Sequence, residues 1–168
     1  NKFMKILGLA VLALQLTSCG ALTDNIDILN STAIPSLGTF FSSGTYSVNS
    51  PYAEANPYWI LNSNSYGSYL APARGIIGEI GTSSIIPSTS FVTIIHSGRV
   101  ATRVHGISGL VGVRSGDVVQ AGAMVASFFT TTTVAFQVLV DGVSVCPLSY
   151  MSSAVLGSIY TAGLNLCR

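Results

Sequence analysis

The chain has 168 residues, of which 49% are hydrophobic and only 8% are charged. This length suits one domain with short attachments, and the formal net charge of +1 provides no basic surface for nucleic acid. Soluble domains usually carry about a quarter charged residues. The surface is therefore either covered by a partner or lipid, or solvated by uncharged Ser, Thr, Asn and Gly residues.

Residues 1–18 have the pattern of a secretory signal peptide. Lys2 and Lys5 flank the start of an apolar run at 6–14, which is too short to span a bilayer. The run leads into LTSC, ending at Cys19, which resembles the lipobox of bacterial lipoproteins. That resemblance implies cleavage before Cys19 and a covalent lipid on its thiol and new amine. The alternative is an ordinary apolar leader with an incidental cysteine.

Cleavage at this point would leave a chain without lysine, in which five arginines face six acidic residues for a net charge of −1. Acyl chains on Cys19 would hold the chain firmly on a membrane. In bacterial lipoproteins, aspartate after the cysteine is the usual signal for inner-membrane retention, and here Gly20 stands there. The resemblance therefore favours an outer-membrane anchor with the body in the periplasm, and the charge excludes a nucleic-acid partner.

Residues 19–57 show no sustained periodicity and are rich in Ser, Asn, Gly, Thr and Pro. This composition is typical of a loop, although its aromatic residues argue against a disordered chain. We expect a lipid-anchored tether that packs in part on the body or on a partner.

Residues 58–151 are predicted to form an all-β domain, an antiparallel sandwich or barrel. Short Val- and Ile-rich runs alternate there with glycine-containing turns. The expected turns are Ala73-Arg74-Gly75, Ser97-Gly98, Ser115-Gly116-Asp117, Ala121-Gly122 and Asp141-Gly142. Within the third turn, Gly116 should adopt a positive φ and Asp117 should cap the turn locally.

The C-terminal tail, residues 152–168, contains a stretch at 152–166 that predicts a short helix ending near Gly163. The tail also holds Cys167. In an oxidising compartment Cys167 could pair with Cys146 and close a loop of about 20 residues. The alternative is two buried thiols.

A two-residue turn at Ser97-Gly98 would pair residue 96 with 99 and residue 94 with 101. One face of the hairpin would then be the core face, with Phe91, Thr93, Ile95, Val100, Thr102 and Val104. The other would carry Val92, Ile94, His96, Arg99, Ala101, Arg103 and His105. In this register the two histidines share a face but lie about 20 Å apart. They could not bind one metal ion together.

Four stretches resemble, in order, the lysostaphin/LytM-type peptidoglycan endopeptidases. They are LAPARGIIGEIG (70–81), FVTIIHSGRVATRVHGIS (91–108), VRSGDVVQAGAMVAS (113–127) and VAFQVLVDGVSVCPLSYM (134–151). In that family the second is a hairpin with a His-Gly turn and a Tyr-Ala-His-Leu-type return. The fourth is a closing strand pair that begins His-Leu-His-Phe-Glu. The resemblance covers about residues 65–151 and implies the LytM-type, duplicated-hybrid-motif-like β fold.

The family's enzymes hold one Zn²⁺ with an upstream His-x-x-x-Asp motif and the second histidine of His-x-His. Here Thr133 and Ala135 stand at the His-x-His positions, and the upstream region contains no histidine. His105 matches the Tyr-Ala-His histidine, which assists catalysis without binding metal, and His96 matches the structural turn position. Catalytic zinc needs three protein ligands. The resemblance therefore implies a degenerate domain with a vestigial His105 and no metal.

A similar sheet carries biotin or lipoate in the barrel-sandwich domains, which attach the group to a lysine at a hairpin tip. The mature chain would contain no lysine, so we expect no cofactor beyond the lipid on Cys19. Arg99, Arg103 and His105 could line the former substrate groove, because arginine suits carboxylate recognition. The alternative is that both arginines belong to a solvated face.

The favoured function is that of a non-catalytic periplasmic lipoprotein, a structural component of a cell-envelope assembly. The low charge and the aromatic tether favour this interpretation. The first alternative, implied by the resemblance, is a peptidoglycan-binding module or a regulator of cell-wall hydrolases. The second, an active zinc endopeptidase, would need ligands that the sequence lacks.

Overall fold

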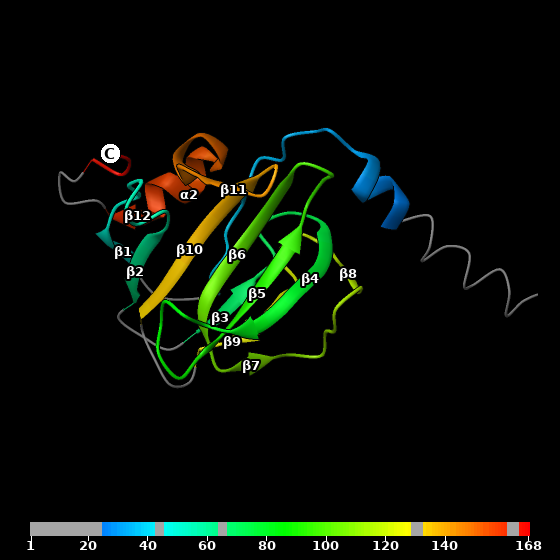
Figure 1. The fold of residues 1–168 in the computed structure, drawn as a ribbon, viewed down its shortest axis with the longest axis horizontal. Coiled ribbons are helices and arrows are strands. Elements are labelled where there is room, and N and C mark those ends of the chain that lie inside the picture. Colours follow the sequence, from blue (N-terminus) through cyan, green and yellow to red (C-terminus); the bar gives the residue numbers. More distant parts are fainter. Residues whose placement is uncertain (1–24, 43–45, 64–66, 129–132, 161–164) are drawn as a thin grey trace, which may run out of the picture.

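The computed structural model describes residues 25–42, 46–63, 67–128, 133–160 and 165–168. Cys19 and residues 1–18 lie outside these ranges, and so does the predicted helix end near Gly163. Strands dominate the described residues (Figure 1). Their bounds are β1 (Tyr46–Ser50), β2 (Trp59–Ser63), β3 (Ser68–Leu70), β4 (Gly75–Thr82), β5 (Ser90–Ile95), β6 (Val100–Ile107), β7 (Gly109–Leu110), β8 (Val118–Val119), β9 (Met124–Ser127), β10 (Thr133–Val140), β11 (Val143–Val145) and β12 (Ile159–Tyr160).

The strands form two sheets. The large sheet has the order β12-β1-β2-β10-β6-β5-β4-β8, with β11 paired to β10, and the small sheet has the order β3-β9-β7. Figure 1 shows β10, β6, β5 and β4 side by side with the small sheet behind them. All pairings between these strands are antiparallel except that of β1 with β12. The expected antiparallel sandwich is confirmed, and the described strands do not close into a barrel.

The core fills the space between the two sheets. In β10, Val134, Phe136 and Val138 are buried, because alternate residues of a strand point to the same side. The hydroxyl groups of Tyr69 in β3 and Thr102 in β6 lie 3.1 Å apart, a buried hydrogen bond that joins the two sheets. Ala135 and Gln137, which alternate with the core residues of β10, therefore point to the other side of the large sheet.

Residues 37–57, expected to form a tether, contribute β1 and several buried side chains to this core. Phe40 stacks on Phe136 with ring centroids 4.4 Å apart, and Phe41 stacks on Tyr46 at 3.9 Å. Leu37 is fully buried. The aromatic residues that argue against disorder are thus the ones that attach this segment to the sheets.

The tail contains a 3₁₀ helix, η1 (Pro147–Tyr150), and an α-helix, α2 (Ser153–Ser158). The predicted helix ends earlier than expected, because the backbone becomes extended at Ile159 (φ −90°, ψ 99°) and pairs with Tyr46 of β1. Burial of the Ile159 side chain in the core accompanies this pairing. No described helix is long and apolar enough to cross a membrane.

Two predicted turns have the expected geometry. Asp141 and Gly142 both have positive φ (50° and 80°) between the paired residues Val140 and Val143, which is the two-residue hairpin that Asp-Gly favours. Gly116 has φ 92°. The carboxylate of Asp117 accepts a hydrogen bond from the backbone N–H of Arg114 at 2.7 Å.

The predicted register of the β5–β6 hairpin is wrong by one residue. Ile95 lies opposite Ala101 and Thr93 opposite Arg103, so Ser97, Gly98 and Arg99 all lie in the turn. The hydroxyl of Ser97 accepts hydrogen bonds from the backbone N–H groups of Arg99 (3.3 Å) and Val100 (3.1 Å), which holds this longer turn. A shift of one residue exchanges the faces of a strand.

This correction places the two histidines on opposite faces of the sheet. His96 points to the core side, where its Nε2 lies 2.9 Å from the hydroxyl of Thr102 and its Nδ1 lies 3.0 Å from the carbonyl oxygen of Arg74. Burial lowers the pKa of His96. His105 is directly opposite Phe91, not Ser90 as the predicted register required.

Candidate functional site

The large sheet has a second face, which points away from the small sheet. We call it the outer face and define it by the following side chains: Ile60 of β2, Phe91 and Thr93 of β5, Arg103 and His105 of β6, and Ala135 and Gln137 of β10. The registers of these strands place the seven residues on one side.

Ala135, the predicted position of a zinc-binding histidine, lies in a row across three strands. Ile60 is directly opposite it in β2 and His105 is directly opposite it in β6. Ala135 is fully buried and its side chain has no donor atom. A zinc ion placed here would meet a methyl group and an isoleucine where it needs nitrogen or oxygen ligands.

Thr133, the other His-x-His position, is engaged with the neighbouring strand. Its hydroxyl lies 3.0 Å from Oδ1 of Asn62 and donates a hydrogen bond to it. Within the described ranges, no three His, Cys, Asp or Glu side chains are grouped so that they could hold a metal ion. The donor set of this face does not fit the zinc ion that the family's enzymes carry.

His105 has a partner at each ring nitrogen. Nδ1 lies 3.1 Å from the hydroxyl of Ser83, and Nε2 lies 3.3 Å from Oε1 of Gln137. The Ser83 oxygen already accepts two backbone N–H groups, so its hydrogen can be donated to Nδ1, which leaves Nε2 as the donor to Gln137. This pattern fixes one neutral tautomer. Burial lowers the pKa of His105, the Gln137 contact opposes that shift, and the charge of Arg103 adds to it.

Arg103 lies beside His105 and is held by the protein itself. Its Nε donates to the hydroxyl of Thr93 at 2.8 Å, and its Nη2 donates to the carboxylate of Glu79 at 2.5 Å. The guanidinium also lies 4.6 Å from the ring centre of Phe91. The structure thus brings together two of the three residues predicted to line a groove.

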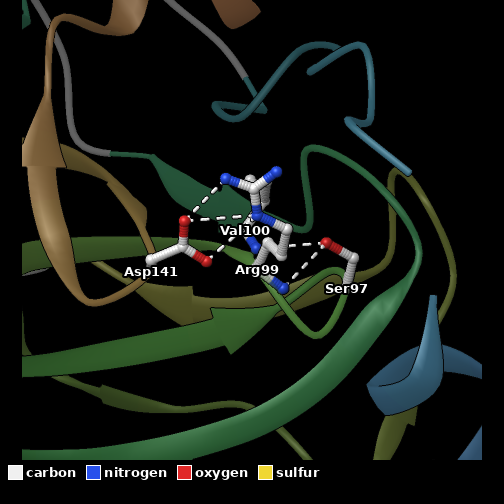
Figure 2. Close-up of polar contacts among 4 residues, drawn as sticks. All are labelled: Ser97, Arg99, Val100 and Asp141. Atoms are coloured by element: carbon white, nitrogen blue, oxygen red, sulfur yellow. Dashed lines mark hydrogen bonds and ion pairs between the residues drawn. The ribbon is translucent and has the colours of Figure 1, made fainter. Parts of the chain in front are cut away.

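Arg99, the third, lies apart in the β5–β6 turn. Its guanidinium forms a two-pronged ion pair with Asp141, with Nη2 2.6 Å from Oδ2 and Nε 3.1 Å from Oδ1 (Figure 2). The hydrogen bond from Arg99 lowers the pKa of Asp141. Both arginines are therefore already paired with carboxylates of the same chain.

The segment that contains Pro57 contacts the outer face at Gln137. The carbonyl oxygen of Pro57 accepts hydrogen bonds from Nε2 of Gln137 (3.3 Å) and from the hydroxyl of Ser144. Gln137 thus joins His105 to this segment. The sequence analysis did not predict the roles of Ser83, Gln137 and Pro57. Only Gln137 could have been found from the sequence, because it follows Ala135 by two residues and so lies on the same face of the strand.

A disulfide joins Cys146 to Cys167, with their Cα atoms 5.9 Å apart. The neighbouring carbonyl of Leu166 accepts hydrogen bonds from the indole N–H of Trp59 (2.9 Å) and the backbone N–H of Tyr52 (3.1 Å). The C-terminus is thereby attached to the segment that leads to Pro57.

Solved structures that superpose on this chain include an M23 metalloprotease and a chain of a pore-forming complex. Csd3 of Helicobacter pylori superposes with a TM-score of 0.61 at 16% identity, over 76% of this chain and 38% of Csd3. The deep-sea M23 metalloprotease pseudoalterin gives 0.53 at 19% identity, over 71% of this chain and 80% of that protein. The chain has the LytM-type, or M23, fold. A chain of the SpoIIQ–SpoIIIAH pore-forming complex gives 0.50 at 15% identity, over 77% of this chain and all of that one.

No protein-family model matches the sequence, and comparison with curated proteins finds no match. The chain spans well under half the length of Csd3. At these identities the likeness establishes the LytM-type fold alone.

Proposed function

We propose that this LytM-type domain is non-catalytic and acts by binding, as a lipid-anchored structural component of a bacterial envelope assembly. The observation that carries the proposal is the row Ile60, Ala135 and His105 on the outer face. Two of these side chains are apolar, and the third has both ring nitrogens engaged by Ser83 and Gln137. No pair of them could activate a water molecule on a metal.

A protein partner is favoured by the composition and by one of the similar structures. With 8% charged residues, this chain has few groups that would oppose burial in an assembly. The SpoIIQ–SpoIIIAH complex has the same fold in one of its chains and forms a pore. An envelope protein is therefore the proposed partner.

The location is proposed from the N-terminal sequence alone. The LTSC motif would place a lipid on Cys19 and anchor the domain in the outer membrane, facing the periplasm. The mass of the N-terminal peptide from membrane-extracted protein measures the lipid on Cys19 directly.

The proposal is tested by assaying activity and partners in one preparation. The purified chain is supplied with zinc and incubated with sacculi, with an M23 metalloprotease as the positive control. We expect no released muropeptides and less than stoichiometric zinc. Membrane-extracted protein should migrate in size-exclusion chromatography as a large complex. Muropeptide release that is lost on chelation would refute the proposal.

A second candidate function, binding of peptidoglycan or regulation of a cell-wall hydrolase, is favoured by the polar part of the outer face. Arg103, Glu79 and Gln137 present hydrogen-bonding groups there. Co-sedimentation with sacculi separates the two candidates. Binding that falls in Arg103→Ala and persists in Arg99→Ala would favour the second, because Arg99 lies apart from that face.

A further inference from the structure

One edge of the molecule is formed by segments far apart in the sequence. Backbone hydrogen bonds join them: Gly98 N–H to Ser31 O at 2.8 Å, Asp141 N–H to Arg99 O at 2.8 Å, and Leu37 N–H to Tyr150 O at 2.8 Å. Residues 25–36, the β5–β6 turn, the β10–β11 turn and η1 are therefore continuous. Figure 1 shows these segments along the upper edge of the view.

This edge carries most of the large hydrophobic side chains that the described residues expose. We call it the apolar rim and define it by Ile26 (53% exposed), Leu29 (49%), Ile34 (63%), Val143 (65%) and Leu148 (39%). Such a concentration is unlike the singly scattered apolar residues of an ordinary surface.

The helical residues 25–30 are seated on the body and still present apolar side chains outward. Ile28 is buried, and the carbonyl oxygen of Leu29 lies so close to Gly98 that a Cβ there would be 2.3 Å away. Ile26 and Leu29 project from the other side of the same turns. Their exposure is therefore imposed by the docking of the helix through Ile28.

The occupant of the rim is indicated by what precedes it. The described chain begins at residue 25, on the rim itself, six residues after Cys19, the proposed site of the lipid. A chain held to a bilayer through Cys19 brings the rim to the lipid surface first. The charged pair Arg99 and Asp141 on the rim is mutually neutralised, which lowers the cost of approaching an apolar medium.

We propose that the apolar rim lies on the bilayer surface, so that the domain is oriented with β7 and β9 pointing away from the membrane. This inference rests on the proposed lipid anchor. The contact is hydrophobic, because the described rim segments add only Asp27 to the neutral ion pair, and Arg74, of opposite charge, lines the same hollow as Asp27. It should need no anionic lipid and resist salt, unlike attraction to a charged surface.

The test uses the full chain with phosphatidylcholine vesicles that contain a photoactivatable acyl chain. Adducts are mapped to peptides by mass spectrometry. We expect adducts in residues 25–36 and 141–150, unchanged by added salt. Leu29→Ser with Val143→Ser should lower adduct formation at the rim about tenfold, because both changes remove apolar contact area. Val111→Ser with Met124→Ser is the matched control, since these exposed residues lie at the small sheet. It should leave the rim adducts unchanged.

Adducts confined to residues before 25, or spread equally over the rim and the small sheet, would overturn the proposal. So would an equal effect of the two double variants. The intact mass of the N-terminal peptide is measured in the same sample. An unmodified Cys19 would refute the lipid anchor, whereas adducts on the rim from added vesicles report on the rim itself.

Discussion

Ala135 faces His105 directly across β10 and β6, and its methyl group is fully buried. Ala135→His supplies the imidazole that the metal site would need. We expect it to lower the free energy of unfolding by about 1 to 3 kcal/mol, because the larger side chain overpacks this position. It should also bind no stoichiometric zinc, since His105 could supply only a second ligand and Ile60 offers no third.

Urea denaturation with and without zinc measures both effects. Ala101→His is the control, because Ala101 lies on the same face of β6 at a partly exposed position. A zinc-dependent increase in the stability of Ala135→His would contradict the donor analysis.

The stability of the domain should fall as the pH is lowered below neutrality. Burial lowers the pKa of both His96 and His105 below the usual 6.5, so the unfolded chain binds these protons more readily than the folded chain. The histidines contribute stability above about pH 6.5, and it is lost as the pH falls through their lowered folded values. His105→Gln and His96→Gln should each flatten this dependence, as measured by urea denaturation from pH 7.5 to 4.5. An unchanged slope in both variants would show that other groups dominate.

Removal of the Cys146–Cys167 disulfide should destabilise the domain and loosen the segment that contacts the outer face. The bridge spans 21 residues, and a loop of this size contributes about 3 kcal/mol in the chain-entropy model. In Cys146→Ser with Cys167→Ser, the amides of Tyr52 and Arg168 should exchange with solvent faster, because they bond across this junction. Ser144→Ala, which removes a contact to Pro57 and keeps the disulfide, is the control. Equal exchange rates in both variants would mean that the disulfide does not hold the segment.

The two arginines should differ in their effect on stability. Arg103 contacts Thr93, Glu79 and the ring of Phe91, so Arg103→Ala should cost about 1 to 2 kcal/mol. The pair of Arg99 with Asp141 is exposed to solvent, and Arg99→Ala should change stability little, with the change vanishing at high salt. Urea denaturation of both variants at low and high ionic strength measures their free energies of unfolding. A larger loss of stability in Arg99→Ala than in Arg103→Ala would contradict the prediction.

The sequence was sufficient to predict the fold class and the turns with strong local chemistry. Asp141-Gly142 determines its own backbone, since both residues tolerate positive φ. The alternation of Val134, Phe136 and Val138 is enough to place Ala135 on the opposite face of the strand. These features depend on neighbouring residues only, which is why a single sequence reveals them.

The hairpin register could not be predicted in the same way. Ser97-Gly98 fits either a two-residue or a three-residue turn. The hydrogen bonds to the Ser97 hydroxyl and the approach of Leu29 to Gly98 favour the three-residue turn. The second of these contacts comes from a distant segment. The same is true of Gln137 and Pro57, whose meeting depends on where β2 enters the sheet.

The row of Ile60, Ala135 and His105 also constrains how this sequence can change. A chain that binds metal here would differ at Ala135 and at one neighbouring position at least. A polar replacement of the buried Ala135 alone would lack a metal to compensate for its burial. Sequences with only one of the two replacements would fold less stably than the present chain or a chain with a complete metal site. We therefore expect substitutions to accumulate in the exposed rim and turns before they restore a metallopeptidase site. The stability of the folded domain itself then keeps metal ligands out of this row.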